Sequence, residues 1–302
     1  MRSSLIRPAP TALAAAATLV SACSASAPTA VPRPDPALAS RTVVTRLGPV
    51  AVHETGAGAP LVLLHAIGHD HRDFDAIVPA LAARRHVLAI DWPGHGDSPT
   101  PASAGTVAAT DFADALEDLT AALDVGPAAF LGNSVGGFAA ARLAARHPQR
   151  VSALVLVDPG GFGELGWLER AFCHVKGTET VTGWVWNAFP AHYLVMRNEH
   201  TAAILARIRA AETPDGVRVH AAVWRSFLAP GHDLRGESAA IRAPTLIAWG
   251  EDDPVLPVAD GERAAALIPG ARLVRFPTGH MPFAEAPEAF LEAVEPFLAS
   301  AP

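Results

Sequence analysis

A serine in a glycine-rich turn is the clearest sign of chemistry in this chain of 302 residues. Ser134 lies within residues 132–136, whose letters GNSVG fit the pattern G-x-S-x-G. The apolar run 128–131 before it predicts a buried strand, and the stretch 138–147 after it predicts a helix. A serine on a tight strand-to-helix turn has its hydroxyl pushed out of the backbone, where a substrate reaches it. The pattern therefore predicts that Ser134 is a nucleophile.

Four other segments place polar or glycine residues directly after apolar runs. They are LVLLHAIG (61–68), VLAIDWPGHGDS (87–98), TLIAWGEDDP (245–254) and LVRFPTGHMP (273–282). Each apolar run predicts a buried strand, and helical stretches lie between them. Strands that alternate with helices indicate an α/β fold with a mostly parallel sheet covered on both faces.

With the serine turn, these segments resemble, in their order, the α/β-hydrolase superfamily over about residues 42–298. The resemblance implies the α/β-hydrolase fold, with helices flanking the central sheet and a helical cap. It also implies a catalytic triad that follows the chain as Ser, then Asp or Glu, then His. In this sequence that order gives Ser134, Asp253 and His280.

Chemistry assigns a role to each member of this set. The hydroxyl of Ser134 needs a base within hydrogen-bond reach, and the imidazole of His280 both accepts and returns a proton near neutral pH. Asp253 holds the ring in the right tautomer and stabilises the imidazolium that forms. By resemblance, the oxyanion is bound by the backbone N–H groups of Val135 and Ile67. The family usually has glycine where this chain has Ala66.

Other acidic and imidazole side chains compete for these roles. Asp252 and Asp158 are alternatives for the acid, but the spacing of Asp253 from the preceding glycine and the following proline matches the family best. The Pro-Gly-His-Gly loop after Asp91 predicts a structural turn. His65 is interpreted as a residue that shapes its loop.

Strand patterns stop between Asp158 and Thr245, and residues 160–240 are predicted to form the helical cap between core segments 41–159 and 241–302. Residues 201–211, for example, have apolar positions at helical spacing. Four of the six tryptophans lie in the cap, and together with other aromatic side chains they predict an apolar roof over the serine. The four are Trp167, Trp184, Trp186 and Trp224.

The first residues resemble an export signal. Basic residues precede the short apolar stretch 11–20, and residues 1–22 are predicted to be a signal peptide. The sequence Val-Ser-Ala-Cys ending at Cys23 resembles a bacterial lipoprotein box, which implies lipid attachment to Cys23 and a place in the cell envelope, anchored to the membrane. The alternative is soluble secretion, because 25–27 is an A-x-A site. Residues 23–40 are proline-rich and predict a flexible tether.

Composition narrows the function further. The net charge is −7 and basic residues are not clustered, so no nucleic-acid partner is expected. No run after the signal segment is long enough to cross a membrane. Neither zinc-type Cys/His spacing nor a nucleotide-binding glycine pattern is present, so no metal and no cofactor are expected. With Cys23 lipidated, Cys173 has no intramolecular disulfide partner.

The sequence favours a serine hydrolase, a carboxylesterase that acts on a small apolar acyl or aromatic ester through an acyl-serine. Two alternatives use the same triad, namely a carbon–carbon bond hydrolase, whose turn resembles GNSVGG, and a lactonase. Carbon–carbon hydrolases typically have Trp directly after the catalytic histidine, where this chain has Met281. The alternative outside the enzymes is a catalytically inactive hydrolase-like protein used for binding. Such proteins usually lack a triad member.

Overall fold

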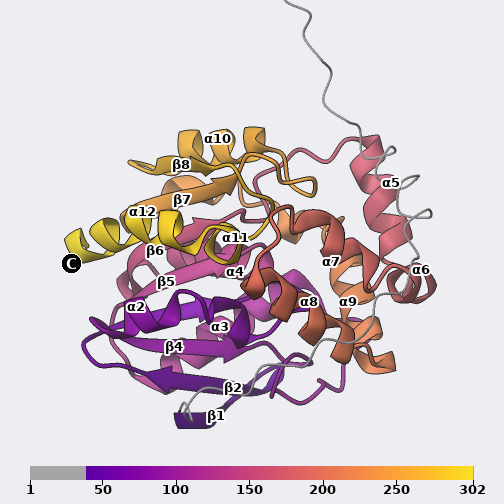
Figure 1. Cartoon of the computed structure of the whole chain (residues 1–302), viewed down its shortest axis with the longest axis horizontal. Coiled ribbons are helices and arrows are strands. Elements are labelled where there is room, and N and C mark those ends of the chain that lie inside the picture. Colours follow the sequence, from indigo (N-terminus) through magenta and orange to yellow (C-terminus); the bar gives the residue numbers. More distant parts are fainter. Residues whose placement is uncertain (1–38, 302) are drawn as a thin grey trace, which may run out of the picture.

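The computed structural model describes residues 39–301, which form an eight-stranded sheet in the order β1-β2-β4-β3-β5-β6-β7-β8 (Figure 1). Strands from β4 to β8 in that order pair in parallel, whereas β2 is antiparallel to both of its neighbours. The strands are β1 (Ala39–Thr45), β2 (Gly48–Thr55), β3 (Ala59–Leu64), β4 (Arg85–Asp91), β5 (Ala128–Asn133), β6 (Val151–Val157), β7 (Thr245–Gly250) and β8 (Arg272–Phe276). The predicted α/β-hydrolase fold, a mostly parallel sheet between helices with a helical cap, is confirmed.

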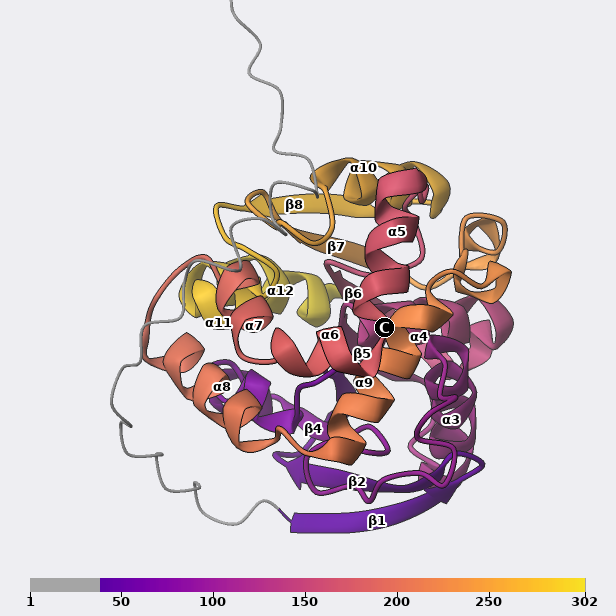
Figure 2. The same cartoon turned by 90° about the vertical axis from the view of Figure 1, so that its right-hand side faces the viewer.

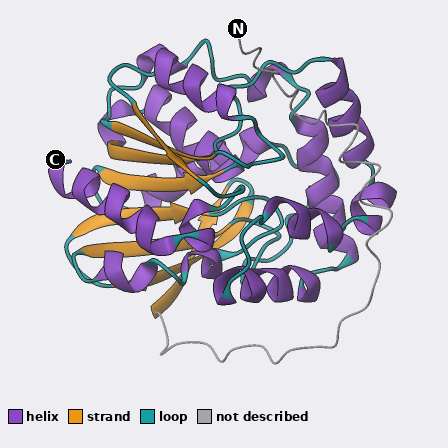
Figure 3. Cartoon of the chain, turned by 45° about the horizontal axis from the view of Figure 1, so that its top comes forward, coloured by secondary structure: helices purple, strands orange, loops and turns teal. Residues whose placement is uncertain are grey.

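Central strands are apolar throughout because both faces of the sheet are covered. In β3, Val62 and Leu64 face one core, while Leu61 and Leu63 face the other. Helices α3 (Ala109–Leu123), α4 (Val135–Arg146) and α10 (Val258–Leu267) bury their apolar side chains in the first core. The second core is covered by α2 (Val78–Ala82), α11 (Pro282–Glu285) and α12 (Pro287–Ser300). Figure 3 shows the strands as one layer among these helices.

Five helices between β6 and β7 form the cap. They lie together at one end of the sheet (Figures 1 and 2). They are α5 (Trp167–Lys176), α6 (Glu179–Trp184), α7 (Ala188–Tyr193), α8 (Glu199–Ala210) and α9 (Pro214–Ser226). The described residues also form short 3₁₀ helices at His71–Phe74, Pro148–Arg150, Pro230–His232 and Ser238–Ala240. The helix expected at 201–211 is α8.

The signal peptide (1–22), the lipidation of Cys23 and most of the tether (23–40) lie outside the described residues and stay predictions. β1 begins at Ala39, at the end of the proposed tether. Within residues 39–301, none of the helices has the length and apolar character needed to cross a bilayer.

Candidate active site

Ser134 occupies the one-residue turn between β5 and α4. Its backbone has φ 54° and ψ −114°, a combination that costs energy for a residue with a side chain and that persists only where its surroundings enforce it. The backbone N–H of Ser134 donates to the carbonyl of Val157 at 3.0 Å, and its carbonyl accepts from the N–H of Phe138 at 2.9 Å. The turn is thereby fixed to β6 on one side and to α4 on the other.

Gly136 lets α4 approach the end of β3 closely. A Cβ atom at this position would lie 2.3 Å from the carbonyl oxygen of Leu64 and 2.9 Å from that of His65. Both are backbone atoms of the sheet and of the loop that follows it, so they cannot move aside independently. The glycine therefore sets the distance between the serine turn and the loop 65–68.

Gly136→Ala is expected to destabilise the protein by about 2 kcal/mol or more, because the added methyl group forces α4 away from β3. Denaturant unfolding monitored by circular dichroism measures the change. Gly236→Ala is the matched control, since its Cβ would meet no atom of residues 39–301 within 4 Å. Equal stability of the two variants would contradict the close approach.

His280 and Asp253 are brought together by the loops after β8 and β7. Nδ1 of His280 lies 2.6 Å from Oδ2 of Asp253, and both side chains are buried. The other carboxylate oxygen of Asp253 accepts from the N–H groups of Val255 (2.7 Å) and Leu256 (3.2 Å). A carboxylate at Nδ1 selects the tautomer with the proton on that nitrogen, which leaves Nε2 free to accept a proton.

Asn133 links the serine turn to the histidine loop. Its side-chain amide donates to the carbonyl of His280 at 3.0 Å and to that of Val157 at 3.1 Å. The residue beside Ser134 is thus bonded directly to the histidine that the sequence assigns as its base. Asn133 is buried, and its role was not foreseen from the G-x-S-x-G pattern.

Asp158, the rejected alternative for the acid, lies inside the same cluster. One ligand atom from each of Asp158, Asp253 and His280 falls within 4.8 Å of the others, close enough to hold a metal ion. Asp158 accepts from the N–H of Gly250 at 3.0 Å, whereas the ring of His280 is hydrogen-bonded to Asp253. Burial, and then the charge of Asp253, raise the pKa of Asp158 well above its usual value. The raised pKa favours the uncharged carboxylic acid form of Asp158 beside Asp253. Asp252 is exposed.

His65 orients the peptide that carries the proposed second oxyanion donor. The N–H of Trp92 donates to Nε2 of His65 at 3.0 Å, so the ring proton is on Nδ1, which lies 2.6 Å from the carbonyl of Ala66. Burial lowers the pKa of His65, in keeping with this neutral form. Because C=O and N–H point in opposite directions in a trans peptide, the N–H of Ile67 points away from His65. His65 shapes its loop, as the sequence suggested.

Two backbone N–H groups near the serine turn have no acceptor among residues 39–301. They belong to Ile67 and to Val135, the first residue of α4. The helix dipole adds positive potential at Val135. The structure thus places both residues at the loop and helix end that Gly136 holds close together.

Glu285 organises the histidine loop and was missed in the sequence. Its buried carboxylate accepts from the N–H groups of Gly279 (2.9 Å) and Met281 (3.1 Å), on either side of His280. It also accepts from Val195 (2.9 Å) and Met196 (2.8 Å) just after α7. One carboxylate therefore ties the cap to the loop of His280. An acidic residue between two apolar residues, as in Phe-Ala-Glu-Ala, is the signal that could have found it.

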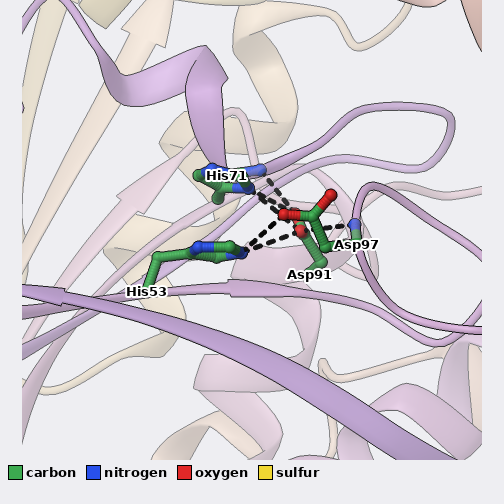
Figure 4. A group of neighbouring side chains, drawn as sticks. All are labelled: His53, His71, Asp91 and Asp97. Atoms are coloured by element: carbon green, nitrogen blue, oxygen red, sulfur yellow. Dashed lines mark hydrogen bonds and ion pairs between the residues drawn. The ribbon is translucent and has the colours of Figure 1, made fainter. Parts of the chain in front are cut away.

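A second cluster of titratable groups lies at the end of β4. The rings of His53 and His71 are stacked with centroids 3.5 Å apart, and both point at the carboxylate of Asp91 (Figure 4). Nε2 of His53 and Nδ1 of His71 lie 3.2 Å and 2.9 Å from Oδ2 of Asp91, and the backbone N–H of Asp97 donates to the same atom at 2.9 Å. The four side chains are close enough to hold a cation. Hydrogen bonds to Asp91 already account for their arrangement, in line with a structural loop.

The cap aromatics divide into two groups. Trp186, Phe189 and Tyr193 are buried and line a small cavity with Ile67, with room for about one water molecule. Tyr193 packs edge-on against His280 with ring centroids 5.5 Å apart. Trp167 and Trp184, in contrast, are 75% and 80% exposed, so the expectation that all four cap tryptophans form the roof was wrong. Trp224 is buried behind the roof, against Phe189.

The chain is similar to known hydrolases in both sequence and structure. The chain matches the family model of the alpha/beta hydrolase fold over residues 59–174 and 194–287, and it belongs to this family. Pimeloyl-[acyl-carrier protein] methyl ester esterase of Aeromonas hydrophila is 30% identical over 257 residues, which cover 82% of this chain and 99% of that protein. The family and its esterase relatives support a hydrolase.

Two solved structures are similar over most of their length. A hydrolase from Pseudomonas aeruginosa has a TM-score of 0.75 and 30% identity, covering 86% of this chain and 98% of that one. The enol-lactonase from Burkholderia xenovorans has a TM-score of 0.75 and 26% identity, covering 86% and 100%.

Proposed function

We propose that the protein is a serine hydrolase that cleaves the carboxylic ester of an apolar acyl or aromatic substrate through an acyl-serine intermediate. The observation that carries the proposal is the 2.6 Å contact between His280 and Asp253, bonded through Asn133 to a turn that presents Ser134. The similarity to an esterase over 82% of the chain supports the same reaction class.

In the first half of the reaction, Oγ of Ser134 attacks the ester carbonyl while Nε2 of His280 takes the hydroxyl proton. Asp253 stabilises the imidazolium, and the N–H groups of Val135 and Ile67 bind the oxyanion of the tetrahedral intermediate. Collapse of this intermediate breaks the bond to the alcohol, which leaves with the proton from His280.

In the second half, water replaces the alcohol. His280 takes a proton from water, the resulting hydroxide attacks the acyl-serine, and a second oxyanion forms in the same place. Its collapse releases the carboxylic acid and returns the proton to Ser134. No group outside the chain is consumed besides water and the ester.

Lactone hydrolysis is the second candidate. A lactone is an internal ester, so the same steps apply with the alcohol left attached to the acid. The similarity to an enol-lactonase at 26% identity and TM-score 0.75 favours this candidate over other reactions of the triad.

A panel of p-nitrophenyl esters from acetate to decanoate, run beside γ- and δ-lactones, tests the proposal. Turnover of at least one ester is expected, with a preference set by the apolar side chains around the cavity. Turnover of lactones alone would favour the second candidate. Absence of turnover of every ester and lactone would contradict both.

A further inference from the structure

Lys176 is the only lysine in the chain, whose other 22 basic residues are arginines, and it is buried. It ends helix α5 and is 2% exposed. Its Nζ atom lies 5.1 Å from the ring centroid of Phe189 and 5.9 Å from that of Trp224. Aromatic faces attract a cation but do not replace a hydrogen-bond acceptor.

The amine has no ion-pair or hydrogen-bond partner among the described residues. Burial lowers its pKa to about 7. The neighbouring helix α9 contributes His220 and Arg225, and Arg225 donates to the carbonyl of Gly177, directly after Lys176. These neighbours bring no negative charge that would stabilise the ammonium form.

Lys176 lines the small cavity between Ile67 and the cap aromatics, and His220 lines the same cavity with a second donor. The indole N–H of Trp224 donates to Nε2 of His220 at 2.8 Å, and indole has no acceptor role, so the proton of the neutral ring is on Nδ1. That Nδ1 atom is buried and has no partner in the described part of the chain. It lies 2.8 Å from the position of a Cβ on Gly68, which follows the proposed oxyanion residue Ile67.

Lys176 and His220, each with an unpaired donor among the described residues, thus both line the small cavity that also touches Ile67. Among the described residues, no carboxylate lines this cavity, and the hydroxyl of Tyr193 is already bonded to His69. Its remaining walls are apolar, from Trp186, Phe189 and Ile208. Two donors in an otherwise apolar wall fit a carboxylate at the end of a short apolar chain.

We propose that this cavity is a carboxylate subsite, and that the substrate is an ester whose acyl chain ends in a second, free carboxylate, bound by Lys176 and His220. The assignment rests on the proposed function, because the acyl carbonyl must sit at Ser134 while the far carboxylate reaches the cavity. Since the cavity has room for about one water molecule, cap side chains must move to admit the chain.

Selectivity between two matched esters tests the subsite. Monomethyl glutarate carries the terminal carboxylate, and methyl 5-methylhexanoate replaces it with an uncharged isopropyl group of similar size. The wild type is expected to favour the first by at least about tenfold in kcat/KM, as for a charged hydrogen bond. Lys176→Met should abolish that preference, whereas Arg170→Met, which removes an exposed cation from the same helix, should keep it. A wild type that turns over both esters equally, or a Lys176→Met variant that keeps the preference, would overturn the subsite.

A binding measurement separates this proposal from the reaction. Lysine labelled with ¹³C at Cε gives a single side-chain resonance, because Lys176 is the only lysine. In the Ser134→Ala variant, monomethyl glutarate should shift this resonance saturably and raise its titration midpoint, because a bound carboxylate stabilises the ammonium form. The isopropyl analogue should not raise it. If the wild type hydrolyses no ester, the proposed function fails, and an unchanged midpoint with the half ester would overturn the subsite independently.

Discussion

Replacing Ser134 with alanine is expected to lower kcat for ester hydrolysis by at least about 10⁴-fold, because the nucleophile is removed and water must react without forming the acyl-serine. The side chain of Ser134 makes no hydrogen bond within residues 39–301, and its strained backbone is held by bonds of its N–H and C=O groups. The fold should therefore persist. Steady-state kinetics on the best ester of the panel measure the effect.

The control for Ser134→Ala is its thermal unfolding midpoint, which should match that of the wild type. Loss of activity with unchanged unfolding assigns the effect to chemistry. A variant that keeps activity within about tenfold of the wild type would remove Ser134 as nucleophile, since loss of such a nucleophile costs several orders of magnitude in related sites.

Asp253→Asn is expected to lower kcat by about 10⁴-fold, because an amide next to Nδ1 no longer enforces the tautomer that leaves Nε2 free. The hydrogen bond of 2.6 Å between Asp253 and His280 is the structural basis. The same ester assay, with saturating substrate, measures kcat.

Asp158→Asn is the matched control, since it makes the same chemical change at a carboxyl group in the same cluster. Burial and the charge of Asp253 raise the pKa of Asp158, which favours its uncharged form, and asparagine has nearly the same shape and no charge. Its effect on kcat should therefore be far smaller than that of Asp253→Asn. A larger loss at Asp158 would mean that Asp158 is the acid and that the assignment to Asp253 is wrong.

The strands of the core and the serine turn could be predicted because each depends on residues that are adjacent in the sequence. Strands buried on both faces give continuous apolar runs such as Leu61–Leu64, and the glycines around Ser134 report a tight turn directly. His280 and Asp253 each follow a strand, and their order along the chain indicated the pair that the structure brings within 2.6 Å.

The sequence could not predict which cap side chains are buried, because the contacts of the cap join segments that are distant in sequence. Trp167 and Trp184 lie in the same cap segment as Trp186, yet they face solvent, and no period in the sequence separates the exposed tryptophans from the buried one. Lys176 is 109 positions from Ile67, and only the fold places both around one cavity. Its being the single lysine was the available signal.

The bonds of Asn133 and Glu285 also depend on tertiary structure. Asn133 and Glu285 both bind backbone groups of the loop that carries His280. Every residue has such backbone groups, so the sequence does not show which of them a side chain will bind. The sequence therefore identified the residues proposed to react, while the residues that hold them became visible only in the fold.

Labelling with a fluorophosphonate, followed by intact-mass and peptide mapping, tests the central claim most directly. The reagent phosphonylates a serine only where a base and an oxyanion site activate it. The account predicts one adduct per chain, located on Ser134 and absent from Ser134→Ala. An adduct on another residue, or none on the folded wild type, would contradict the assignment of Ser134 as an activated nucleophile.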